Sequence, residues 1–175
     1  YDINKAIHYF TLAANQNHIE SQECLGKIYL LNDSVVRDFD KAIYYLSLAA
    51  NQNNIESQYQ LGKLYLSDKS IYKDVNKAIH YLSLAANQNH IKSQYELGQF
   101  YISDKNIYKD VNKGIHYLEF AANQNHVTAQ FLLGCIYFNS NYGRVDLKLA
   151  IYYLKLAAKQ NNKDSHSMLG LIYLS

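Results

Sequence analysis

Apolar residues recur along the chain at the spacing of an α-helix. In residues 39–50 they follow an i, i+3, i+4, i+7, i+8 pattern, which gathers them on one face of a helix. That face consists of Ala42, Tyr45, Leu46, Ala49 and Ala50. A second helix is predicted over residues 19–31. We call the helix of residues 19–31 helix A and that of residues 39–50 helix B, and we expect them to pack as an antiparallel pair.

This helix pair is repeated along the chain at intervals of 36 residues. The dipeptide Leu-Gly begins at Leu25, Leu61, Leu97, Leu133 and Leu169. The dipeptide Ala-Ala, an Asp and a Tyr recur with the same step, starting from Ala13, Asp2 and Tyr9. Such a regular interval is the signature of a repeat protein, in which each unit buries its apolar face against its neighbours.

The repeats predict an all-α fold, a solenoid of antiparallel helix pairs with a 36-residue period. We expect one solenoid domain over residues 1–175. Its predicted parts are a leading helix B (1–15), four full repeats (18–53, 54–89, 90–125 and 126–161) and a trailing helix A (162–175). Because the chain opens within a repeat, we expect it to be a fragment of a longer array.

Several residues of the repeat are predicted to shape the helix ends and contacts. Asp38 precedes helix B and can accept hydrogen bonds from its first free amides. Gly26 and Ala42 are small enough to let two helix backbones approach closely. Gly114 replaces Ala in one copy, at a cost in helix propensity of roughly 1 kcal/mol. Asn53 follows helix B, where a sharp reversal needs a left-handed residue, and Asn tolerates that conformation best after Gly.

Three motifs together resemble the Sel-1-like repeat, a branch of the tetratricopeptide superfamily. One copy reads Ser57-Gln58-Tyr59-Gln60-Leu61-Gly62-Lys63-Leu64-Tyr65, then Asp74-Val75-Asn76-Lys77-Ala78, then Ala85-Ala86. The resemblance covers essentially the whole chain. It implies a right-handed α-α superhelix whose concave side is lined by helix A. It also implies a scaffold or adaptor that binds another protein. The sequence has no Gly-rich phosphate loop, no Gly-x-Ser-x-Gly motif and no His-Glu-x-x-His motif, so we predict no enzyme activity.

The candidate binding residues lie at the helix A positions that differ between repeats. Positions equivalent to Leu25, Gly26 and Tyr29 hardly vary, because a stacking face must stay uniform, whereas a recognition face is free to differ. The variable positions are spaced i, i+3, i+7 on one helix face, which we call the helix A face. The candidate partner-binding residues on it are Glu20, Glu23, Lys27, Glu56, Tyr59, Lys63, Lys92, Tyr95, Gln99, Thr128 and Phe131.

Two alternatives remain open at this point. Each variable position can be an ordinary solvated residue, and the aromatic residues among them can be half buried between helices. The chain can also be an architectural spacer, or the regulatory arm of a larger protein, with its contacts on helix B or on the loops.

Charge and composition narrow the class of partner. Lys and Arg total 17 against 15 Asp and Glu, so a net charge of +2 gives no reason to expect binding to nucleic acid. No apolar stretch approaches the roughly 20 residues needed to cross a membrane. The predicted partner is therefore another protein or a peptide. The open half-repeats at both ends also predict end-to-end self-association of this fragment.

Histidine and cysteine suggest no further chemistry. The histidines recur at repeat positions about 10 Å apart, and no copy supplies the four converging ligands of a structural zinc site. We predict no metal and no cofactor. Cys24 and Cys135 lie about three repeats apart, too far for a disulfide. Unpaired cysteines favour a reducing compartment, so we predict a cytoplasmic location.

Overall fold

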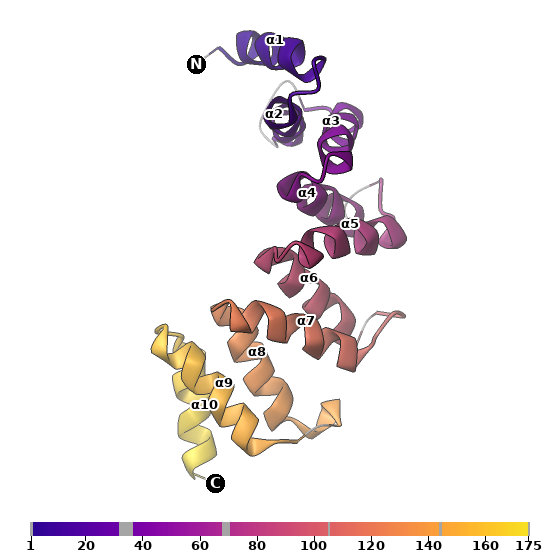
Figure 1. Ribbon diagram of the computed structural model, residues 1–175. Helices are drawn as coiled ribbons and strands as arrows, with labels where there is room; N and C mark the ends of the chain where they lie inside the picture. The colour runs from indigo at the N-terminus through magenta and orange to yellow at the C-terminus, as the bar shows by residue number, and fades with distance from the viewer. Residues whose placement is uncertain (1, 32–36, 68–70, 105, 144, 175) are drawn as a thin grey trace. The chain divides into compact units, whose positions relative to one another are not determined.

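The computed structural model describes residues 2–31, 37–67, 71–104, 106–143 and 145–174. In that part of the chain every regular element is a helix, which confirms the all-α prediction (Figure 1). The chain divides into two compact units, Tyr1–His90 and Ile91–Ser175, which are described separately below. A single domain over all 175 residues, with the repeat boundaries given above, stays a prediction.

The first unit consists of two helix pairs preceded by one helix. Its described helices are α1 (Ile3–Ala14), α2 (Ile19–Leu30), α3 (Phe39–Asn51), α4 (Ile55–Leu66) and α5 (Val75–Asn87). Helices α2 and α4 are helices A, and they make their most extensive contacts with the helices B that follow them, α3 and α5. The first helix A ends one residue earlier than predicted because Leu31 is extended, with φ −61° and ψ 123°. The first full helix B runs one residue further, to Asn51.

The second unit repeats this arrangement from a helix A onward. Its described helices are α6 (Ile91–Ile102), α7 (Val111–Asn123), α8 (Val127–Phe138), the short 3₁₀ helix η1 (Ser140–Tyr142), α9 (Leu147–Lys159) and α10 (Lys163–Leu174). Helices α6 and α7 form one pair, and α8 and α9 form the next.

Each helix pair is closed by a leucine of helix B that packs on the glycine of helix A. Leu82 of α5 is buried, and a Cβ atom placed on Gly62 would lie 2.6 Å from its Cγ. Carbon atoms cannot pack that closely, so a methyl group at this position would force Leu82 to move. The predicted close approach at Gly26 is confirmed, with Leu46 as the neighbour. Gly98 and Gly134 meet Leu118 and Leu154 in the same way.

Gly114 has a steric reason that the sequence did not reveal. A Cβ atom on Gly114 would lie 2.5 Å from Ile102 Cγ2. The equivalent residues in the preceding pair are Leu66 and Ala78. The branched side chain of Ile102 therefore occupies space that an alanine methyl group fills in the preceding pair.

The predicted N-cap of helix B and the predicted left-handed residue after it are confirmed. Asp38 Oδ1 accepts a hydrogen bond from Lys41 N at 3.0 Å, and the Asp38 N–H donates to Tyr29 O at 3.0 Å. Asn53 adopts the left-handed conformation with φ 63°. The equivalent residues Asn17, Asn89, Asn125 and Asn161 have φ between 61° and 63°. Each helix B is thus followed by the same sharp reversal.

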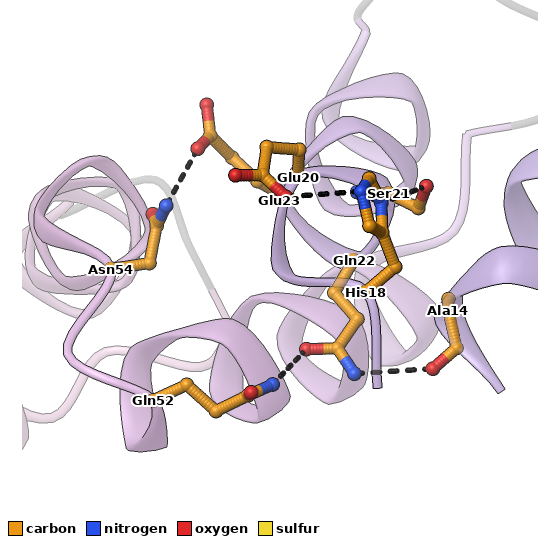
Figure 2. A network of polar contacts seen from close by, with 8 residues as sticks. All are labelled: Ala14, His18, Glu20, Ser21, Gln22, Glu23, Gln52 and Asn54. Atoms are coloured by element: carbon orange, nitrogen blue, oxygen red, sulfur yellow. Dashed lines mark hydrogen bonds and ion pairs between the residues drawn. The ribbon is translucent and has the colours of Figure 1, made fainter. Parts of the chain in front are cut away.

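Buried glutamines connect successive helices. Gln58 of α4 is fully buried, and its Nε2 donates to Ala50 O of α3 at 3.2 Å. Its Oε1 accepts from Nε2 of Gln88, directly after α5, at 2.9 Å. These bonds satisfy a buried amide that would otherwise be costly. The same two bonds are made by Gln22 with Ala14 and Gln52 (Figure 2), and by Gln130 with Ala122 and Gln160.

Candidate partner-binding face

In the first unit, half-buried candidate residues of α2 and α4 form one polar cluster. Lys27 Nζ lies 2.6 Å from Glu23 of its own helix and 3.8 Å from Glu56 of α4. Asn54, the N-cap of α4, donates from Nδ2 to Glu23 Oε2 at 2.8 Å (Figure 2). Burial lowers the pKa of Lys27, but the hydrogen bond to Glu23 and the charges of Glu23 and Glu56 outweigh it and raise the pKa above its ordinary value. Lys27 therefore keeps its positive charge in this cluster.

Glu20 lies at the exposed start of α2. Its carboxylate is 3.3 Å from Nε2 of His18, the N-cap of the helix. Nδ1 of His18 accepts a hydrogen bond from Ser21 N at 3.3 Å. Figure 2 shows Glu20 and Ser21 on either side of this imidazole ring.

Tyr59 and Lys63 of α4 lie one above the other. Tyr59 is only 7% exposed, and its ring meets the ring of His90 edge-on at a centroid distance of 4.8 Å. Lys63 is exposed, and its ammonium group lies 5.5 Å from the centre of the Tyr59 ring. Tyr59 therefore offers little surface to a partner, whereas Lys63 is accessible.

In the second unit, α6 and α8 carry the remaining candidates. The ring of Tyr95 stacks on His126 at a centroid distance of 4.5 Å and an interplanar angle of 28°. Burial raises the pKa of Tyr95, the charge of Glu96 adds to this, and a hydrogen bond with Gln99 opposes it. Tyr95 and Gln99, both candidate residues, are thus in contact.

The candidate residues fall into three groups by exposure. Glu20, Lys63, Lys92, Gln99 and Thr128 are exposed. Glu23, Lys27, Glu56, Tyr95 and Phe131 are partly buried. Tyr59 is buried.

The residue at one variable position contacts the residue that precedes the next helix A. Variation within helix A alone does not reveal this contact. A glutamate at this position is paired with an asparagine, and a tyrosine is paired with a histidine. The pairs are Glu23–Asn54, Tyr59–His90 and Tyr95–His126. Comparison of the residue types 31 positions apart is the sequence signal that could have found them. Part of the variation between repeats therefore comes from contacts between successive repeats.

The described part of the chain offers neither a metal site nor a membrane-spanning helix. Among the described residues, no group of three or more His, Cys, Asp or Glu could hold a metal ion. In the same part of the chain, no helix is both long and apolar enough to span a membrane. Cys24 and Cys135 are free, and burial raises the pKa of each thiol, which keeps the thiols protonated. A cytoplasmic location stays a prediction.

A model of the Sel1 repeat matches residues 1–18, 20–54, 55–90, 91–126 and 127–162. The chain belongs to the Sel1 repeat family. Sel1 repeat proteins are generally protein-interaction scaffolds, and the family is typically non-enzymatic. None of the curated proteins matches the chain.

Solved structures of Sel1 repeat proteins share the fold. A Sel1 repeat protein from Oxalobacter formigenes is 28% identical with a TM-score of 0.78, over 99% of this chain and 71% of that one. The protective antigen c5321 of uropathogenic Escherichia coli is 22% identical with a TM-score of 0.54, over 96% of this chain and 44% of that one. Cysteine rich protein B of Helicobacter pylori is 24% identical with a TM-score of 0.56, over 79% of this chain and 99% of that one.

Proposed function

We propose that this Sel1 repeat chain binds a protein or peptide through the exposed side chains of its helix A face. One observation carries the proposal. Exposed residues occupy two helix A positions that vary along the sequence, on helices whose buried Leu-Gly positions are the same in each internal repeat. They are Glu20 and Lys63 in the first unit, and Lys92, Gln99 and Thr128 in the second.

The partly buried residues of this face have a supporting role in the proposal. Lys27 forms ion pairs of 2.6 Å with Glu23 and 3.8 Å with Glu56, which restrict where these three charges lie on the face. A preorganised surface loses less side-chain entropy on binding than a mobile one. Tyr59 contributes indirectly, because its ring attracts the ammonium group of Lys63 through a cation–π contact.

Site-specific photo-crosslinking in the native cell tests this proposal. A photoreactive residue is placed at Lys63, at Lys92 or, as the matched control, at Lys148, an exposed lysine of helix B in α9. We expect the same protein to be captured from positions 63 and 92 and not from 148. Capture from 148 alone, or equal capture from all three, would contradict the helix A face.

A second candidate function is favoured by exposed apolar residues elsewhere. Ile71 and Ile107, in the loops between helices A and B, are 91% and 93% exposed, and Tyr44 of α3 and Tyr152 of α9 are also exposed. These residues support an architectural spacer or regulatory arm that is bound along its loops and helices B. A photoreactive residue at Ile71 or Tyr44 separates the two functions, because only the second predicts capture there.

We also infer that the 175-residue chain associates end to end with a second copy. In α10, a Cβ atom on Gly170 would meet no atom within 4 Å, and Tyr173 is exposed. Helix α1, a helix B, presents Tyr9 to solvent. Sedimentation should show concentration-dependent association that Gly170→Ala weakens, because every internal pair excludes a methyl group at this position. A chain that stays monomeric at all concentrations would contradict the inference.

A further inference from the structure

His126 is the N-cap of α8, and its side chain supplies the first hydrogen-bond acceptor of that helix. Nδ1 accepts from Ala129 N at 3.2 Å. The first amides of a helix have no partner within the helix, so a cap must offer a lone pair. Asn54 caps α4 in the same way, with Oδ1 accepting from Ser57 N at 2.8 Å. An asparagine cannot gain a proton near neutral pH, whereas a histidine can.

The surroundings of His126 favour its neutral form. The titratable group that faces it from α6 is Tyr95, whose ring stacks on the imidazole. The groups that approach from α7 and from the end of α9 are neutral: Ala121 O accepts from His126 N, and Gln160 donates to Asn125 O. Burial lowers the pKa of His126 below its ordinary value of 6.5, and a hydrogen bond to the backbone of residue 126 partly offsets this.

The other histidine cap has a different environment. His18 caps α2 through Nδ1, but Glu20 places a carboxylate 3.3 Å from its Nε2. The residue equivalent to Glu20 in α8 is Thr128, which carries no charge. Both caps accept a backbone amide through Nδ1, but they differ in two respects. His18 has a carboxylate beside Nε2 and the Ser21 hydroxyl 2.8 Å from Nδ1, whereas the equivalent residues in α8 are Thr128 and Ala129.

We propose that His126 is an acid-sensitive cap: a proton taken from solvent by Nδ1 removes the acceptor of the Ala129 amide and loosens the contact between α6 and α8 at Tyr95. After protonation, an N–H group faces another N–H group at the positive end of the helix dipole. The aromatic ring of Tyr95 attracts a cation and acts in the opposite direction.

The sign of the pH dependence follows from the lowered pKa. The folded state favours neutral His126, so the stabilisation from this residue is complete above the unfolded value of 6.5. It is lost progressively as the pH falls below that value. The inference stands whether or not Tyr95 binds a partner, because it concerns the folded chain alone.

Three chains test the proposal: the wild type, His126→Asn and Thr128→Glu. NMR titration of the wild-type imidazole should place the His126 midpoint below 6.5, and Thr128→Glu should raise the midpoint. Between about pH 7.5 and about pH 5, the wild type should lose several degrees more of Tm than His126→Asn. His18→Asn is the matched control, because it replaces a histidine cap that has a carboxylate beside it.

The proposal is overturned by an equal loss of Tm in the wild type and His126→Asn, or by a His126 midpoint at or above 6.5. If His126→Asn does not fold, the NMR midpoint of the wild type alone decides the question. Exchange of the Ala129 amide reports on the cap directly, since acid should increase its opening in the wild type.

Discussion

Helices α4 and α10 carry the same Leu-Gly-x-x-Tyr sequence but differ in what covers it. In α4, Gly62 lies against Leu82, and Tyr65 is 7% exposed and stacks on Tyr81 at 6.0 Å. In α10, the equivalent of Tyr65 is 64% exposed, and its glycine faces open space. The glycine and tyrosine of this motif are therefore buried only where a helix B packs against them.

The polar positions of the two helices differ in the same way. Gln58 of α4 is buried and bonded to two neighbouring helical segments, whereas its equivalent in α10 is His166, which is exposed. Nδ1 of His166 lies 3.0 Å from Asn162 O, one turn earlier. The cost of a substitution should thus depend on whether a helix B follows, even where the sequence motif is identical.

Replacing the glycine of each motif by alanine should give the largest difference between α4 and α10. We expect Gly62→Ala to destabilise the protein by about 2–3 kcal/mol, because its methyl group would overlap Leu82. In the 175-residue chain, Gly170→Ala should be stabilising by up to roughly 1 kcal/mol, because alanine favours the helix and no described atom lies within 4 Å of the added methyl group. Urea unfolding at a low protein concentration measures both. Effects of equal sign would contradict the role given to Leu82.

The buried glutamine should show the next largest difference. Gln58→Ala removes a fully buried amide together with its hydrogen bonds to Ala50 O and Gln88 Nε2, so we expect a loss of about 2 kcal/mol. His166→Ala should change stability by less than about 0.5 kcal/mol, because the side chain is exposed. Thermal unfolding of the two variants checks this, and a similar fall in Tm for both would refute it.

Substitution of the left-handed residue after helix B by valine should destabilise the protein equally at Asn53 and at Asn161. Asn53 and Asn161 have φ of 63° and 61°, and a branched side chain is strained in this region. Asn53→Val and Asn161→Val should each lose about 1–2 kcal/mol, whereas glycine at either position should be neutral or stabilising. A smaller loss at 161 than at 53, measured in urea, would show that packing contributes to the turn.

The smallest effect concerns the pair α6–α7. Gly114→Ala should destabilise by about 1 kcal/mol, because overlap with Ile102 exceeds the gain in helix propensity. Adding Ile102→Leu recreates the Leu66 and Ala78 combination of the preceding pair and should restore stability. A double-mutant cycle measures the coupling, and additive effects would exclude a steric link between the two residues.

Local features of the fold could be predicted because one period of sequence determines them. The cap at Asp38, the reversal at Asn53 and the close approach at Gly26 each depend on residues within a single helix pair. The buried glutamines were missed because a polar residue in an amphipathic helix suggests the surface. Their presence at the same position in four successive repeats was the available signal.

The helix A face was harder to predict because some of its residues contact the next repeat and others are exposed to solvent. Variation between repeats was interpreted as recognition, but Tyr59 is buried against His90, and Glu23 is bonded to Asn54. The spacing of residues on one helix cannot show what the next helix brings to the same place. Lys63 and Gln99, one turn further along their helices, are exposed.

The bonds of Gln58 reach eight residues back and thirty residues forward along the chain. Both partners recur with the period of the sequence, so a gene that gained or lost whole multiples of 36 codons would return every such glutamine to an equivalent pair of partners. An insertion of any other length within the helices would separate a glutamine from one of its two hydrogen-bond partners. Unequal recombination can therefore change the number of repeats while each glutamine keeps an equivalent pair of hydrogen-bond partners.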